Sequence, residues 1–180
     1  MKIVYHGSKA LFDRFDYSKM GQNGTSEGFG FYFTNNKTVA ENYAHNGYLY
    51  TVEFNGKKSL SSTKKTITKT QLKKFIRHLH KISDESFLWD YGDLSRNSIE
   101  SVLTYAVNLT YDNNDNDVDI ICELCNVFGS REKVLTALYN TLGYDSIQTL
   151  AEWDHNTGKE NMLYIALVND IIKIIEVTKL

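Results

Sequence analysis

Runs of apolar and β-branched residues near both ends of the chain predict β-strands. The predicted strands cover residues 2–6, 31–34 and 48–54 in the N-terminal part, and residues 144–150, 162–167 and 171–177 in the C-terminal part. A hairpin-like loop is expected at residues 154–158. The glycine-rich residues 21–30 predict a flexible loop.

The middle of the chain has the spacing of amphipathic helices instead. The predicted helices cover residues 71–82, 98–109, 118–128 and 131–142, and Gly143 ends the last of them. A further helix is expected to start at Asn35 or Asn36 and to run through Tyr43. Residues 111–119 are rich in Asp and Asn and predict a solvated loop. They resemble a calcium loop only loosely, because its glycine and closing glutamate are missing. Strands at both ends with helices between them predict an α+β fold.

Length and charge narrow the class of protein only slightly. A chain of 180 residues is most simply one domain, and its net charge of −2 gives no global case for binding nucleic acid. The charge is uneven, however, because residues 57–81 hold nine Lys or Arg and no acidic residue. This run, Lys57 to Lys81, has two readings: a solvated lysine-rich face, which we favour, or a surface for a polyanion.

Cys122 and Cys125 are the only cysteines, and their spacing in an apolar run predicts two thiols on one face of a buried helix. A zinc site normally needs four ligands and no second pair is present, so we expect no metal. Two free thiols without a signal peptide are typical of a reducing, cytoplasmic compartment. The longest apolar stretches are too short to cross a membrane.

Three features near the N-terminus point to a ligand. His6, Gly7 and Ser8 lie where a predicted strand ends, so that the backbone of Gly7 is open to a ligand without hindrance from a β-carbon. Tyr32 lies on the strand after the glycine-rich loop, and Tyr43 follows eleven residues later on the next helix. Two aromatic faces and an accessible backbone would suit a flat polar ligand. Taken singly, the histidine is more typical of a structural role and each tyrosine of a core position.

Together, these motifs resemble the H-Y-E branch of the ADP-ribosyltransferase superfamily. The resemblance rests on Tyr5-His6-Gly7-Ser8, on Gly28-Phe29-Gly30-Phe31-Tyr32-Phe33-Thr34 and on Ala40-Glu41-Asn42-Tyr43-Ala44. Residues 12–21 are similar to the transferase domain of polyvalent phage and mobile-element proteins. The similarity covers residues 3–54 well and returns more loosely at 143–147 and 164–173, whereas the central helical part aligns with nothing.

The resemblance implies that NAD+ is the substrate and gives each motif residue a role. His6 would hydrogen-bond a ribose hydroxyl of the adenosine half, and Gly7 would offer its N–H and C=O to the nicotinamide carboxamide. Ser8 would support the same pocket, while Tyr32 and Tyr43 would sandwich the nicotinamide ring. The loop that ends at Gly30 would fold over the dinucleotide.

The catalytic set implied by the resemblance is His6, Tyr32 and a glutamate that opens a late strand. Glu160 is the candidate for this carboxylate, and Glu152 is a weaker substitute. Counting back from the last predicted strand would instead place Met162 or Leu163 at the position of the glutamate. Both registers remain open from the sequence.

The fold implied by the resemblance is a split β-sheet core with a helical insertion. Residues 1–56 would form the NAD-binding half, residues 57–142 a mostly helical insertion and residues 143–180 the C-terminal strands. The implied activity is mono-ADP-ribosyl transfer to a protein or nucleic acid, a glycosyltransferase reaction, in the cytoplasm of a bacterium or infected host cell as a phage or toxin-system effector. The alternatives are an NAD+ glycohydrolase and an inactive transferase fold that acts as a binding or inhibitor module.

Overall fold

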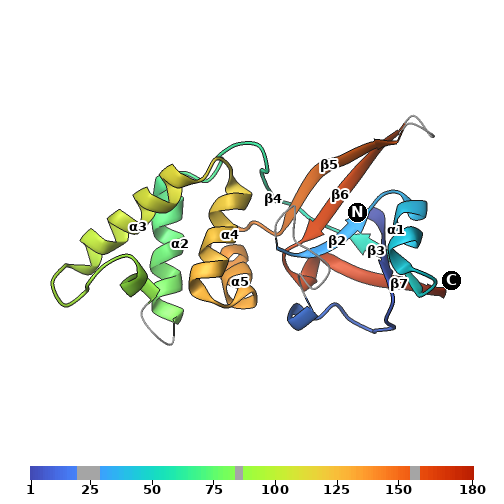
Figure 1. Ribbon diagram of the computed structural model, residues 1–180, viewed down its shortest axis with the longest axis horizontal. Helices are drawn as coiled ribbons and strands as arrows, with labels where there is room; N and C mark the ends of the chain where they lie inside the picture. Colours follow the sequence, from blue (N-terminus) through green and yellow to red (C-terminus); the bar gives the residue numbers. More distant parts are fainter. Residues whose placement is uncertain (20–28, 84–86, 155–158) are drawn as a thin grey trace. The chain divides into compact units, whose positions relative to one another are not determined.

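The computed structural model describes residues 1–19, 29–83, 87–154 and 159–180, without the side chains of residues 151–160. Most of the glycine-rich loop and residues 155–158 of the expected hairpin loop therefore lie outside the described residues. The chain forms two compact units (Figure 1). The sheet unit comprises Met1–Ser59 and Asp145–Leu180, and the helical unit comprises Leu60–Tyr144. The α+β class predicted from the sequence is confirmed.

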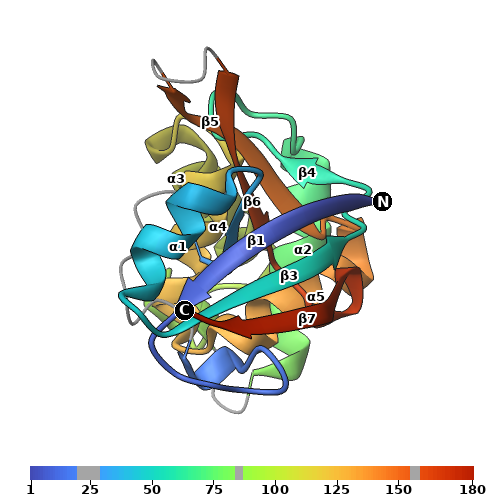
Figure 2. The same cartoon turned by 90° about the vertical axis from the view of Figure 1, so that its right-hand side faces the viewer.

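One seven-stranded sheet runs in the order β4-β5-β6-β2-β1-β3-β7. Its strands are β1 (Lys2–Ser8), β2 (Phe31–Thr34), β3 (Tyr48–Phe54), β4 (Ser59–Leu60), β5 (Ser146–Asp154), β6 (Lys159–Ala166) and β7 (Ile172–Lys179). Figure 2 shows β1, β3 and β7 side by side, and the ladders that join them are antiparallel. The six predicted strands are confirmed, and the two-residue β4 was not expected.

The largest difference from the predicted strands is at β5 and β6. Strand β5 ends later, at Asp154, and β6 begins earlier, at Lys159, than their apolar residues predicted. Their ladder continues to the pair Asp154↔Lys159. A register shift between Leu150 and Glu152 lies within this extension. The residues of this extension lack the apolar alternation of a half-buried strand, so the sequence pattern did not predict it. Their pairing depends on the backbone ladder instead.

The core of the sheet unit is aromatic and aliphatic. Its side chains with at most 2% exposure include Val4, Phe33, Tyr50, Val52 and Phe54. Helix α1 (Lys37–Ala44) packs on β1 and buries Ala40 and Ala44. Asn36 caps this helix, and its side-chain oxygen accepts hydrogen bonds from Thr38 N and Val39 N.

The helical unit consists mainly of α2 (Lys69–Ile82), α3 (Ile99–Asn113), α4 (Asp117–Phe128) and α5 (Arg131–Leu142). Each of these helices begins after a polar cap, and the caps are Thr68, Ser98, Asn116 and Ser130. Gly143 ends α5 at φ 75° and donates its N–H to Tyr139 O, as predicted. The predicted helices are confirmed to within a few residues.

The predicted loop at residues 111–119 is wrong at both ends. Helix α3 continues to Asn113, and α4 begins at Asp117 after its cap Asn116. The Asp and Asn residues that predicted a loop instead supply the end of one helix and the cap of the next. Asp117 is fully buried, and its carboxylate accepts hydrogen bonds from the backbone N–H groups of Ser61, Thr66 and Ile67.

Cys125 is buried in α4 and Cys122 is half-buried, and the two are not joined by a disulfide. Burial raises the pKa of the Cys125 thiol. Within the part of the chain that the structure describes, no group of three His, Cys, Asp or Glu side chains is placed to hold a metal ion. None of the described helices is long and apolar enough to span a bilayer.

Candidate functional site

Strand β1 is paired unequally with its two neighbours. Its ladder with β3 runs from Lys2↔Phe54 to Ser8↔Tyr48. In the described ladder with β2, by contrast, the paired residues are Tyr5 and Thr34 alone. Continued in the same register, the next hydrogen-bonded position, two residues further on, would set Gly7 opposite Tyr32, and the described ladder does not include it. The sheet therefore splits between β1 and β2 at Gly7, near the C-terminal end of β1.

The side chain of His6 crosses this split. Its Nδ1 lies 2.7 Å from Tyr32 O. Because a carbonyl oxygen can only accept a hydrogen bond, Nδ1 must carry the proton. The neutral ring then presents Nε2 as an acceptor. A side chain thus takes the place of the ladder bond at Tyr32, and the structure brings these two predicted site residues together.

The backbone of Gly7 is directed toward the same split. Asn35 N donates to Met162 O, so that Asn35 points its backbone groups toward β6. Backbone groups alternate in direction along a strand, so those of Thr34 and Tyr32 point the other way, toward β1. This agrees with the bond from His6 to Tyr32 O. By the same alternation, Tyr5 and Gly7 direct their N–H and C=O groups toward β2. A ligand between the two strands would meet one donor and one acceptor from Gly7.

Aromatic rings enclose His6 on its own face of the sheet. Phe15 and Phe33 lie at centroid distances of 5.2 and 5.8 Å from the imidazole, and Phe12 stacks on Tyr50 at 4.1 Å. The Tyr50 hydroxyl accepts a hydrogen bond from Phe12 N at 2.7 Å, which fixes this segment over β3. Burial lowers the pKa of His6, and the hydrogen bond to Tyr32 O opposes that shift in part.

Helix α1 explains why residue 7 is glycine. A β-carbon at this position would lie 1.9 Å from Ala40 O and 2.7 Å from Ala44 N. The sequence suggested that the missing β-carbon makes room for a ligand, but in the structure α1 occupies that space. Because Ala44 N lies this close to Gly7, the backbone of the preceding residue Tyr43 also lies next to the split, and Tyr43 is 71% exposed.

Ser8 and Gly30 shape the backbone around the split. The Ser8 hydroxyl oxygen accepts a hydrogen bond from Ala10 N at 3.1 Å and so stabilises the turn after β1. A β-carbon at Gly30 would lie 2.3 Å from Ile165 Cγ2, so that this glycine permits close packing of the start of β2 against β6. Both contacts describe packing within the chain, and the roles predicted for these two residues in binding NAD+ stay predictions.

The backbone of β6 places Glu160 opposite Trp153 at the start of the strand. The side chains of Glu160 and of its weaker substitute Glu152 lie outside the described residues. The register with β2 sets Leu163 opposite Thr34. Sequence reasoning missed Asn161, the next residue after Glu160, which is 8% exposed and accepts a hydrogen bond from Asn36 Nδ2 at 2.9 Å.

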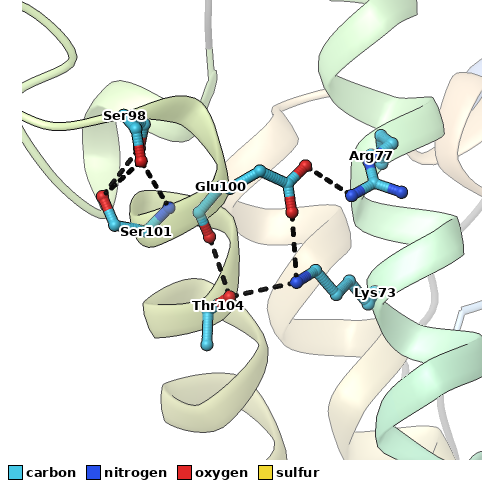
Figure 3. A network of polar contacts seen from close by, with 6 residues as sticks. All are labelled: Lys73, Arg77, Ser98, Glu100, Ser101 and Thr104. Carbon is cyan, nitrogen blue, oxygen red and sulfur yellow. Dashed lines mark hydrogen bonds and ion pairs between the residues drawn. The ribbon is translucent and has the colours of Figure 1, made fainter.

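The basic run that begins at Lys57 supplies several cations to contacts inside the helical unit. Glu100 on α3 binds both Lys73 and Arg77 of α2, at 3.2 and 2.5 Å (Figure 3). Lys69 forms an ion pair with Asp112 at 2.9 Å. These cations hold α2 to α3, and a polyanion would have to compete with that network.

A family model described as ADP-ribosyltransferase in polyvalent proteins matches residues 1–166, which end at the last residue of β6. No curated protein matches the chain, and no solved structure does.

Proposed function

The chain belongs to the family of ADP-ribosyltransferases in polyvalent proteins, and from this membership we propose that it moves ADP-ribose from NAD+ to a macromolecular acceptor. The family supports a transferase that uses NAD+ as its substrate. The acceptor class, the residues that act and the biological setting are the parts that we infer.

The observation that carries the proposal is the split between β1 and β2. The nicotinamide carboxamide has an acceptor oxygen and a donor NH2 group, which match the N–H and C=O that Gly7 directs toward β2. We assign the ring stacking to Tyr43, whose side chain is 71% exposed beside this split, and the opposite face of the ring to Tyr32. Ser8 and the loop that ends at Gly30 complete the binding set.

His6 supplies an acceptor rather than a charge in this proposal. Its Nδ1 proton is committed to Tyr32 O, so Nε2 is left to accept a hydrogen bond from a ribose hydroxyl. Burial lowers the pKa of His6, which keeps the ring neutral at physiological pH. A protonated ring would offer a donor at Nε2 in place of the acceptor.

The proposed reaction is a displacement at the anomeric carbon of the nicotinamide ribose. The C–N bond to nicotinamide breaks, and its electron pair leaves with the neutral base. A lone pair of the acceptor forms the new bond to carbon, and the acceptor proton passes to solvent. The Glu160 carboxylate would stabilise the positive charge that develops on the sugar, which is the origin of the rate increase.

The test measures nicotinamide release and transfer of labelled ADP-ribose to lysate proteins and nucleic acids. We expect His6→Ala and Tyr43→Ala to raise KM for NAD+, and Glu160→Gln to lower kcat by a factor of about 100 or more. Tyr105→Ala is the matched control, because Tyr105 is an exposed tyrosine of the helical unit. Wild-type protein that neither transfers label nor releases nicotinamide would contradict the proposal.

The same measurements separate the alternatives. Nicotinamide release without a labelled macromolecule would identify an NAD+ glycohydrolase. NAD+ binding by calorimetry without turnover, or no binding, would identify an inactive fold that serves as a binding module. Transfer to nucleic acid that is lost at raised salt while nicotinamide release is unchanged would indicate that the basic run recognises the acceptor.

The organisation and setting that we propose follow from the family. We infer that Leu60–Tyr144 is a helical insertion in a split-sheet transferase domain, and that the protein adds single ADP-ribose units as a phage or toxin-system effector. Two cysteines that form no disulfide with each other fit a reducing cytoplasm. Labelling that yields one ADP-ribose per modified site would support the mono-transferase assignment.

A further inference from the structure

Two asparagines far apart in the sequence join the start of α1 to the start of β6. Asn36 Nδ2 donates to Asn161 Oδ1 at 2.9 Å, and Asn161 is 8% exposed. The other end of the same amide caps α1, because Asn36 Oδ1 accepts from Thr38 N at 3.0 Å and from Val39 N at 3.4 Å. One side chain therefore both starts the helix and binds the strand.

A second contact lies next to this one. Asn35 N donates to Met162 O at 3.3 Å, and Met162 N donates to Asn35 Oδ1 at 2.9 Å. These bonds extend the β2–β6 pairing beyond Thr34↔Leu163, partly through side chains. The start of α1 is thus held to β6 by both asparagines, and a shift along the strand would break these bonds together.

The two segments joined in this way carry different parts of the proposed reaction. Helix α1 carries Tyr43, the proposed stacking residue, and the residue before Asn161 is Glu160, the proposed carboxylate. We propose that Asn161 is a positioning residue that, through Asn36, fixes the spacing between the nicotinamide-binding helix and the strand of the catalytic glutamate. This inference rests on the proposed function. Loosening the contact should slow the chemical step more than it weakens NAD+ binding, because transition-state stabilisation depends on placement of the carboxylate.

The experiment compares kcat and KM for nicotinamide release in wild type, Asn36→Ser, Asn161→Ala and the double variant. Serine keeps a capping oxygen at position 36 but lacks the amide donor. We expect each single variant to lower kcat about tenfold or more, and to change KM for NAD+ less than about twofold. The double variant should be no slower than the worse single variant, since both remove the same bond.

A conservative variant should restore the contact. Asn36→Asp keeps the cap, and the Asn161 amide can turn to donate its Nδ2 hydrogen to the new carboxylate. We expect kcat within about threefold of wild type. If Asn36→Asp is as slow as Asn36→Ser while its unfolding temperature is that of wild type, the bond between the two side chains does not position the site.

A helix cap in the other unit provides the control for stability. Asn116 caps α4 and accepts a hydrogen bond from Asp119 N at 3.0 Å, so Asn116→Ser makes the same change away from the split. It should lower the unfolding temperature to a similar degree and leave kcat unchanged. Wild-type kcat in Asn161→Ala, or an equal fall in Asn116→Ser, would overturn the positioning role alone. Absence of nicotinamide release from wild type would instead overturn the proposed function.

Discussion

The sheet unit and the helical unit both contain a buried aspartate, but the two carboxylates join different kinds of segment. In the sheet unit, Asp145 accepts hydrogen bonds from the backbone N–H groups of Lys57 and Lys58 and holds the chain segment after β3 against the start of β5. In the helical unit, Asp117 lies in the first turn of α4 and binds the N–H groups of Ser61, Thr66 and Ile67. The first joins two segments of a sheet, and the second fixes a loop to a helix end.

Other polar contacts also differ between the sheet unit and the helical unit. In the sheet unit two contacts are long-range and partly buried, that of His6 with Tyr32 and that of Asn36 with Asn161. In the helical unit the polar contacts include local helix caps, such as Ser98 and Asn116, and exposed ion pairs such as that of Glu100 with Arg77. We therefore expect substitutions in the sheet unit to affect NAD+ chemistry, and substitutions in the helical unit to affect stability alone.

The largest effect is expected for Asp117→Ala. Removal of this buried carboxylate leaves the backbone N–H groups of Ser61, Thr66 and Ile67 without their acceptor, and we expect a loss of about 3–5 kcal/mol in the free energy of unfolding. Urea unfolding followed by the helical circular dichroism signal measures this loss. Asp115→Ala is the control, because Asp115 is exposed in the short loop before α4.

NAD+ binding by the Asp117→Ala variant tests whether the division between the units holds. If the helical unit only supports its own structure, the affinity at a temperature where the sheet unit stays folded should equal that of wild type. A loss of NAD+ affinity while the sheet unit stays folded would contradict this division and would show that the helical unit contributes to NAD+ binding.

Gly7→Ala is expected to rank next, with its effect in the sheet unit. The new β-carbon would lie 1.9 Å from Ala40 O, so α1 must move off β1. We expect a loss of about 2–3 kcal/mol in the free energy of unfolding and NAD+ affinity lowered by a factor of about 10 or more. Gly92→Ala in the helical unit is the matched control, because its β-carbon would meet Val102 at 3.4 Å, an ordinary contact. Equal effects of the two substitutions would contradict the steric argument.

Local sequence patterns were sufficient for most elements. The apolar spacing predicted four helices in the middle of the chain, and the polar residue before each helix together with Gly143 marked several of their ends. The histidine and one tyrosine of the N-terminal motifs do lie together in the fold, since His6 binds Tyr32 O across the split in the sheet, and their roles in a site stay predictions. These predictions succeed because each depends on residues within one or two turns or on one strand.

Contacts between distant residues were not predictable from the same patterns. Nothing local marks Asp117 as a buried carboxylate, because its acceptor role depends on a loop about fifty residues earlier in the chain. The bond between Asn36 and Asn161 spans 125 residues, and an asparagine after a strand predicts only a cap. The reason for glycine at position 7 also depends on the path of α1, which the sequence gives only after the helix is placed on the strand.

The pH dependence of stability should distinguish the half-buried His6 of the sheet unit. Burial lowers the pKa of His6 in the folded state, so the unfolded chain binds the proton more readily. The contribution of His6 to stability is therefore complete above its unfolded pKa of about 6.5 and is lost as the pH falls through the lower folded value. Unfolding midpoints in urea between pH 7.5 and 5 measure this loss, and His6→Phe should flatten the slope. An unchanged slope in that variant would show that another group titrates.

The smallest effect is expected for Glu100→Gln in the helical unit. Glu100 is exposed, and its contacts with Lys73 and Arg77 lower the pKa of its carboxyl, but water and salt screen these contacts strongly. Stability should fall slightly at low ionic strength, and the difference from wild type should vanish near ~1 M salt. Nicotinamide release should stay at the wild-type rate. If labelling of nucleic acid rises in this variant because two cations of α2 lose their acidic partner, the basic run contributes to acceptor recognition, and the helical unit acts in more than its own stability.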